Sequence, residues 1–155
     1  MAEHNLVPLK PVREMAAPAG WAHAPQFDPF EVYLGPFFER HVEGAHEFAL
    51  LLDERHLNAA EVAHGGALMT FADAVLGYCV WDATDRAYCV TVSQQTNFLS
   101  AAVSGELVTC RPVVIRKTRE IVFTRGDFFV GARAVFTATS IWKVRLPPKA
   151  GSGGA

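Results

Sequence analysis

Residues 58–81 read NAAEVAHGGALMTFADAVLGYCVW, and the expected architecture of the chain follows from this stretch. A polar segment leads through two adjacent glycines, Gly65 and Gly66, into a run whose apolar residues recur at three- and four-residue spacing. That spacing predicts an α-helix that begins at Gly65. Because the helix is apolar over most of its circumference, we expect it to be buried and not to lie on a surface.

The sequence around this helix is rich in strand patterns. Before it, Asp28 and Pro29 predict the start of a short helix over 29–34, because they suit the N-cap and the first helical position. The segments that we predict as strands are 37–42, 47–53, 87–98, 106–115, 118–129 and 132–144. A helix that is apolar nearly all round needs a sheet that curls about it. We therefore predict an α+β fold, with an antiparallel sheet wrapped around one long central helix.

Length and composition limit the kinds of function that the chain can have. The 155 residues suit one domain, which we place at 27–144, between a partly flexible arm over 1–26 and a flexible tail over 145–155. The net charge of −2 lacks the basic excess of a nucleic-acid binder. We find no apolar run of about 20 residues that could span a bilayer, no secretory leader and no histidine spacing that suggests a metal site. Three cysteines in apolar stretches predict reduced thiols and a cytoplasmic protein.

The entry into the central helix is the first candidate for chemistry. A helix begins with unpaired backbone N–H groups and the positive end of its dipole. Gly65 has no side chain that would block a ligand, so its N–H could polarise a carbonyl oxygen as an oxyanion hole does. The alternative is a plain tight turn into a helix, and the two glycines alone do not decide between these interpretations.

Asp73 is the second candidate, since it is the only acid between Gly65 and Trp81. Burial should raise the pKa of this carboxyl, which suits a general base, whereas the alternative is an Asp paired with a neighbouring polar group. Gly65 and Asp73 are eight residues apart, or about 12 Å along a helix. That span is too long for both to act on one carbonyl carbon. If both are catalytic, the carboxylate should come from a second chain across a two-fold interface.

These residues resemble a known family. Asn58, His64, Gly65, Gly66 and Asp73 are similar in type and spacing to the motif of the phenylacetate-degradation type of hotdog acyl-CoA thioesterases. The resemblance extends over about 36–144. It implies a hotdog fold, hydrolysis of an acyl-CoA thioester, no resident cofactor, and a homodimer or homotetramer.

The resemblance also implies a role for each matching residue. The Gly65 N–H would polarise the thioester carbonyl, and Asn58 would help to bind or orient it. Asp73 of the partner subunit would activate water or attack the carbonyl directly, and Thr91 would hydrogen-bond the water or the carboxylate. His64 would orient the loop or contact the thioester sulfur, or alternatively only cap the helix, and Gly66 would contact the substrate.

The phosphates of coenzyme A would need basic contacts. The cluster Arg116, Lys117 and Arg119 is our candidate, with an ordinary solvated turn as the alternative. The sequence departs from the family at Ser100-Ala101, where relatives often have Arg-Pro. Two other functions stay open: a hotdog hydratase or dehydratase, and a non-catalytic module that binds acyl-CoA on the same fold.

Overall fold

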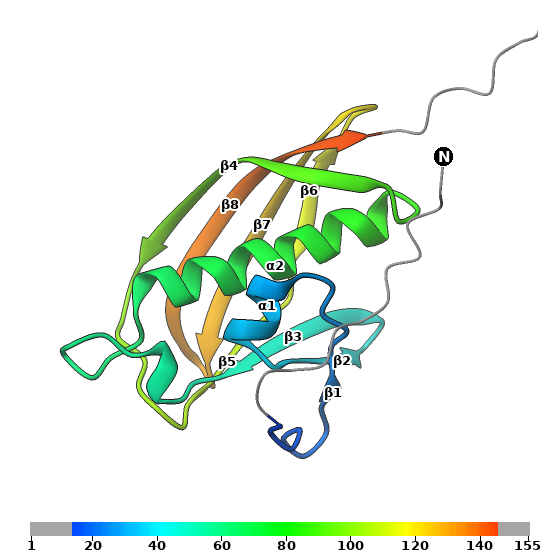
Figure 1. The fold of residues 1–155 in the computed structure, drawn as a ribbon. Helices are drawn as coiled ribbons and strands as arrows, with labels where there is room; N and C mark the ends of the chain where they lie inside the picture. Colours follow the sequence, from blue (N-terminus) through cyan, green and yellow to red (C-terminus); the bar gives the residue numbers. More distant parts are fainter. Residues whose placement is uncertain (1–13, 146–155) are drawn as a thin grey trace, which may run out of the picture.

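The computed structural model describes residues 14–145, and its fold is an antiparallel sheet curled around one long helix (Figure 1). The helix is α2, Gly65–Ala83, and it crosses the face of an eight-stranded sheet. The predicted α+β class and the wrapped sheet are therefore confirmed. Residues 1–13 of the predicted arm and 146–155 of the predicted tail lie outside the described residues.

The elements before α2 begin and end at local sequence signals. They are β1 (Ala22–His23), α1 (Pro29–Leu34), β2 (Phe37–Val42), β3 (Ala45–Leu51) and the 3-10 turn η1 (Glu54–His56). The Asp28 carboxylate accepts a hydrogen bond from the Glu31 N–H at 2.8 Å and so caps α1, as predicted. β3 starts two residues earlier than the predicted strand over 47–53. The turn at Glu43-Gly44 has positive φ at both residues (53° and 78°), so pairing resumes directly after it.

In the described residues, five strands follow α2, where we predicted four. They are β4 (Tyr88–Phe98), β5 (Leu107–Cys110), β6 (Val113–Lys117), β7 (Ile121–Val130) and β8 (Arg133–Arg145). The prediction of one strand over 106–115 was wrong, because the chain breaks at Arg111-Pro112 into β5 and β6. Proline has no N–H to donate to a sheet ladder, which accounts for the break. Both pieces still pair with β7.

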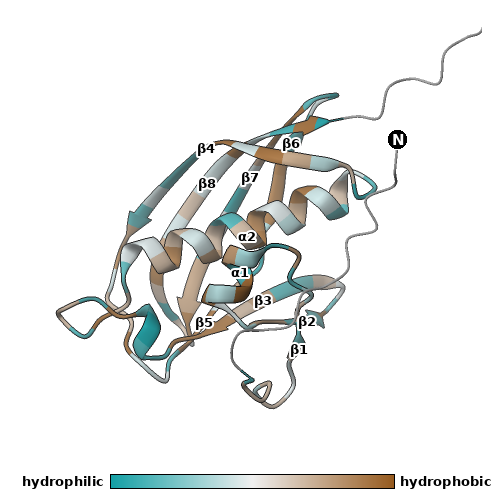
Figure 2. Cartoon of the chain, in the orientation of Figure 1, coloured by the Kyte–Doolittle hydropathy of each residue, from teal (hydrophilic) through white to brown (hydrophobic). Residues whose placement is uncertain are grey.

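The strand order places β4 at an edge of the sheet. The order is β1-β2-β3-β5-β7-β8-β4, with β6 also paired to β7, and every pair is antiparallel. α1 packs across α2 on the side away from the sheet (Figure 1). In Figure 2, β4 is apolar in its first half and hydrophilic toward its end. The long helix thus lies between the sheet, the edge strand β4 and α1.

The core lies between α2 and the sheet. Four buried rings form a continuous row, with centroid separations of 5.2 Å for the tilted pair Phe37–Phe71, 5.7 Å for the edge-to-face pair Phe71–Phe128 and 4.0 Å for the stacked pair Phe128–Phe136. A Cβ atom added at Gly77 would lie 3.0 Å from the Trp142 ring, so glycine lets the helix approach β8 closely. No helix in the described part of the chain combines the length and apolar character needed to cross a membrane.

Candidate active site

The start of α2 leaves one backbone donor open. His64 is the N-cap, and its Nδ1 accepts a hydrogen bond from the Gly66 N–H at 2.9 Å. The N–H groups of Ala67 and Leu68 donate to the His64 carbonyl. Within residues 14–145, the Gly65 N–H has no hydrogen-bond partner. The cap therefore satisfies the N–H groups of Gly66, Ala67 and Leu68 and leaves the Gly65 N–H available to a ligand.

A pocket opens at this helix start. It has a volume of ≈ 340 Å³ and is lined by Val62, Ala63, Gly65, Leu68, Phe98, Leu99, Ser100, Ala101 and Ala102. A Cβ atom at Gly65 would lie 3.0 Å from the Phe98 ring, so a side chain at this position would crowd the pocket. The lining is apolar apart from the Ser100 hydroxyl and the backbone. Gly65, with its unpaired N–H at the positive end of the helix dipole, thus borders a slot that suits a carbonyl with an apolar neighbour.

Asn58 shapes the loop before the helix. Its side-chain oxygen accepts hydrogen bonds from the N–H groups of Ala60, at 2.8 Å, and Val62, at 3.4 Å. The Asn58 N–H donates to the Val62 carbonyl at 2.8 Å, which closes the loop. The side-chain oxygen is thus occupied within the loop, and the amide NH₂ group is the part of Asn58 that can meet a ligand.

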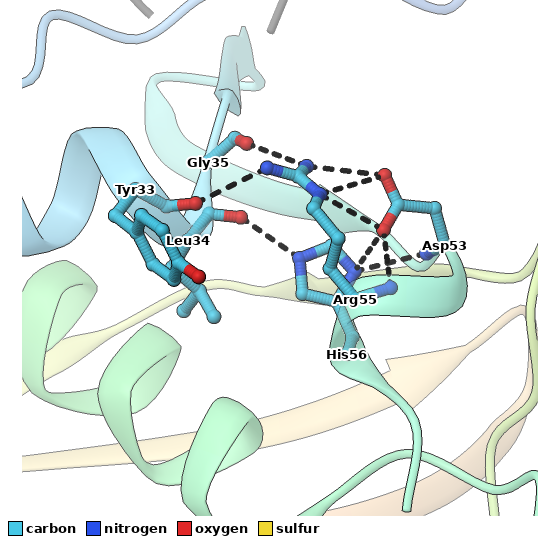
Figure 3. Close-up of polar contacts among 6 residues, drawn as sticks. All are labelled: Tyr33, Leu34, Gly35, Asp53, Arg55 and His56. Atoms are coloured by element: carbon cyan, nitrogen blue, oxygen red, sulfur yellow. Dashed lines mark hydrogen bonds and ion pairs between the residues drawn. The ribbon is translucent and has the colours of Figure 1, made fainter. Parts of the chain in front are cut away.

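The loop is anchored to α1 through η1 (Figure 3). The His56 carbonyl accepts the His64 N–H at 2.7 Å, and the buried His56 ring donates from Nε2 to the Leu34 carbonyl at 2.8 Å. Arg55 donates to the carbonyls of Tyr33, at 3.1 Å, and Gly35, at 2.9 Å. The side chains of Arg55 and His56 therefore satisfy the last carbonyls of α1. These hydrogen bonds hold the loop that leads into α2 in position.

Asp73 lies on the side of α2 that faces β4. The Thr91 hydroxyl on β4 donates to the Asp73 carboxylate at 2.7 Å, so the structure joins these two predicted site residues. Pairing between β4 and β8 shifts register between Thr91 and Ser93, which makes a bulge beside Thr91. Such bulges re-aim side chains. Burial raises the pKa of Asp73 and the nearby charge of Asp28 raises it further, whereas the Thr91 hydrogen bond lowers it.

A second carboxyl, which the sequence analysis missed, lies near Asp73. Burial raises the pKa of Glu31, on α1, to about 7, with further contributions from the charges of Asp28 and Asp73. One oxygen of the Glu31 carboxyl is buried and has no partner in the described part of the chain. A carboxyl with this pKa would exchange its proton near neutral pH. The only sequence signal for Glu31 was its place three residues after the N-cap Asp28.

Within one chain, the predicted residues form two groups and not one. Gly65 lines the pocket, with His64 and Gly66 beside it at the helix start and Asn58 in the loop before it, whereas Asp73 lies away from the pocket and pairs with Thr91. The basic cluster Arg116, Lys117 and Arg119 joins neither group. Lys117 Nζ donates to the Ala83 carbonyl at 2.6 Å, at the opposite end of α2. Arg133, which the sequence analysis did not single out, contacts the pocket wall through Ser100 and Ala101.

Comparison with known proteins supports the arrangement. The model of the family "Thioesterase superfamily" matches residues 60–136. The chain is 30% identical over 130 residues to the Pseudomonas aeruginosa protein named "Putative esterase PA0474", across 83% of this chain and 97% of that protein. The fold is similar to that of a mutant of the phenylacetic acid degradation protein PaaI from Thermus thermophilus. The TM-score is 0.65 and the identity 25%, over 77% of this chain and all (100%) of that one.

A further solved structure is that of a hypothetical thioesterase from Streptococcus pneumoniae with coenzyme A. Its TM-score is 0.62 at 20% identity, over 70% of this chain and 87% of that one, which shows the shared fold. The wrapped helix with a pocket at its start defines the class, a hotdog protein. The chain belongs to the Thioesterase superfamily, and its esterase-named relative supports a hydrolase.

Proposed function

We propose that this protein hydrolyses an acyl-CoA thioester to a free acid and coenzyme A. The observation that carries the proposal is the unpaired N–H of Gly65, a residue at the start of α2 that lines an apolar pocket. The thioester carbonyl oxygen would accept this N–H, and the helix dipole would stabilise the negative charge that develops there. A backbone donor fixed in a helix is preorganised, so it costs little to reorient during the reaction.

Asp73 supplies the proton transfer in this proposal. A water molecule attacks the carbonyl carbon while the Asp73 carboxylate takes one of its protons, and the Gly65 N–H binds the resulting oxyanion. The C–S bond then breaks, and the proton held by Asp73 passes to the leaving thiolate. Thr91 holds the carboxylate in place through its hydrogen bond. In the alternative, the carboxylate attacks the carbonyl itself and water hydrolyses the resulting anhydride.

The proposal requires two chains. β4 is eleven residues long and pairs with β8 along one edge only, within residues 14–145. It exposes Tyr88, Val90 and Val92, with exposed fractions of 62%, 40% and 61%. A long edge strand with exposed apolar side chains is a template for pairing with another strand. A second copy paired along β4 would bring its own α2 alongside, so that the partner subunit's Asp73 approaches Gly65.

The remaining loop residues have supporting roles in this scheme. His64 holds the helix start through its hydrogen bond with Gly66, and Asn58 offers its amide NH₂ group toward the thioester. No resident cofactor is part of the proposal, because water and the protein's own groups complete the reaction. The coenzyme A bound to the Streptococcus pneumoniae relative supports this class of substrate.

The test is the release of free thiol from a panel of acyl-CoAs by the native protein and by Asp73→Asn. Asparagine keeps the shape of the side chain and removes its charge. We expect turnover of at least one thioester and a loss of at least about a hundredfold in the variant, the size of a general-base contribution. Unchanged turnover in the variant would contradict the role of Asp73. Binding of acyl-CoA without turnover by the native protein would instead support the non-catalytic module.

A further inference from the structure

The wall of the pocket is a short strip that follows β4, residues 99–102. On one side it is joined to β8, because the N–H groups of Leu99 and Ser100 donate to the Val135 carbonyl at 2.8 and 3.1 Å. On the other side the Ala63 N–H donates to the Ala102 carbonyl at 2.7 Å. The strip therefore connects β8 to the loop that carries His64 and Gly65.

Arg133, the first residue of β8, reaches across this strip. Its guanidinium donates to the Ser100 hydroxyl at 3.2 Å and to the Ala101 carbonyl. It also donates to Glu106 at 2.6 Å, and the other Glu106 oxygen accepts the Val103 N–H at 3.0 Å. These contacts use three of the five N–H donors of the guanidinium. The Arg133 side chain is 41% exposed, and no hydrogen bond within the described residues uses the remaining two donors.

The charge of Arg133 contrasts with the pocket beside it. None of the nine lining residues carries a charge, so the slot suits the uncharged part of a ligand. A thioester whose carbonyl rests on the Gly65 N–H must lead its carrier out past the rim. In coenzyme A the carrier ends in phosphates, and guanidinium is the side-chain group best matched to phosphate oxygens.

We propose that Arg133 binds a phosphate of the coenzyme A carrier at the mouth of this pocket. The inference rests on the proposed function, and it assigns a ligand contact to a residue 68 positions after Gly65 in the sequence. Glu106 competes with the phosphate for the guanidinium, because both offer negatively charged oxygens. Glu106 and the strip thus fix the position of the Arg133 side chain, and its remaining N–H groups bind the phosphate.

The competition gives a test in which two variants move in opposite directions. Arg133→Gln removes the charge and should raise the KM for an acyl-CoA about tenfold with little change in kcat, the loss of one hydrogen bond to a charged group. Glu106→Gln keeps a hydrogen-bond acceptor and removes the competing charge, so it should lower that KM about twofold at low salt. Arg133→Lys keeps the positive charge but loses the parallel N–H donors of the guanidinium. Its KM for acyl-CoA should therefore lie between those of the native protein and Arg133→Gln.

The control is the N-acetylcysteamine thioester of the same acid, which has no phosphate. Its KM should not change in Arg133→Gln. If Arg133→Gln and Glu106→Gln raise the KM for both substrates alike, Arg133 only holds the strip in place, and the proposal is overturned. It is also overturned if Arg133→Gln leaves the KM for acyl-CoA unchanged.

A second readout separates this inference from the proposed hydrolysis. Calorimetry of coenzyme A itself, with the native protein and with Arg133→Gln, needs no turnover. We expect weaker binding by about tenfold in the variant, even if no thioester is hydrolysed. Equal affinity in the two proteins, or no binding to the native one, would contradict a phosphate contact at Arg133.

Discussion

The two ends of α2 differ in how their backbone groups are hydrogen-bonded. At the C-terminal end, the Lys117 ammonium donates to the Ala83 carbonyl, the Arg86 N–H to the Trp81 carbonyl at 2.9 Å, and the Thr84 hydroxyl to the Val80 carbonyl at 2.7 Å. At the N-terminal end, the cap satisfies Gly66 and leaves the Gly65 N–H without a partner in the described part of the chain.

This difference supports the proposed ligand site at the start of the helix. Unpaired groups at a helix end cost free energy unless a cap, water or ligand satisfies them. The carbonyls of Val80, Trp81 and Ala83 are satisfied by the protein itself, which contributes stability. The N-terminal donor belongs to Gly65, which lines an apolar pocket next to Phe98, where a ligand can satisfy it. We therefore place the reaction at the open end and expect substitutions there to have the largest effect on turnover.

The strongest way to break this comparison is to delete the Gly65 N–H. Gly65→Pro does so at the first helical position, which proline tolerates, and His64 already has the extended backbone (φ −66°, ψ 131°) that suits a residue before proline. We expect kcat to fall by about 10²–10³, the cost of one oxyanion donor. Gly65→Ala is the matched control, because it brings the same Cβ atom against Phe98 and keeps the N–H.

The same variant tests whether the site is shared between chains. Neither Gly65→Pro nor Asp73→Asn should be active alone. After unfolding and refolding together, a mixed dimer would contain one intact site with Gly65 from one subunit and Asp73 from the other. We expect recovery of about a quarter of native activity. No recovery from mixed dimers that are shown to form would place both groups in one chain, contrary to the separation of about 12 Å along the helix.

The next effect concerns the carboxylate eight residues from the open end. Thr91→Val removes the hydrogen bond that lowers the pKa of Asp73, so this pKa should rise further. The acid limb of kcat/KM should move to higher pH, with a loss of about tenfold at neutral pH. Asp28→Asn keeps the cap of α1 and removes a charge that raises the same pKa, so the limb should move to lower pH.

A pH–rate profile of each variant makes the measurement. Glu31 on α1 interacts with the charges of both Asp73 and Asp28, so its own pKa should also fall in Asp28→Asn. The Cys89 thiol on β4 interacts with the charge of Asp73. Opposite shifts would identify Asp73 as the group that titrates on the acid limb. Shifts in the same direction, or none, would assign that limb to another group, and Glu31 would be the first to examine.

Much of this arrangement was predictable because its signals are local. Asp28-Pro29 predicts α1, the apolar spacing after Gly65 predicts α2, and the wrapped sheet follows from a helix with few polar positions. The break at Pro112 was also visible in the sequence, yet the β-rich residues on both sides of it favoured one continuous strand. A local breaker can divide a strand whose two pieces keep the same neighbour, since β5 and β6 both pair with β7.

The missed residues depend on register, which no local pattern encodes. Arg133 reaches the pocket wall because Phe98 pairs with Phe136, so the start of β8 lies beside the exit of β4. Glu31 lies near Asp73 because α1 packs on α2. Conversely, Arg116, Lys117 and Arg119 are close to one another in sequence, but the sheet carries them to the far end of the helix.

The smallest expected effect comes from the C-terminal end of α2, where Lys117 donates to the Ala83 carbonyl. Lys117→Met removes the donor to the Ala83 carbonyl and a positive charge at the helix C-terminus. We expect the Tm to fall by about 1–3 °C and kcat/KM to stay within about twofold of the native value. Lys143→Met is the control, since this lysine is exposed and donates to Glu120 on the surface. A rise of about tenfold in KM for acyl-CoA, specific to Lys117→Met, would instead show that this end also meets the ligand, as the basic cluster first suggested.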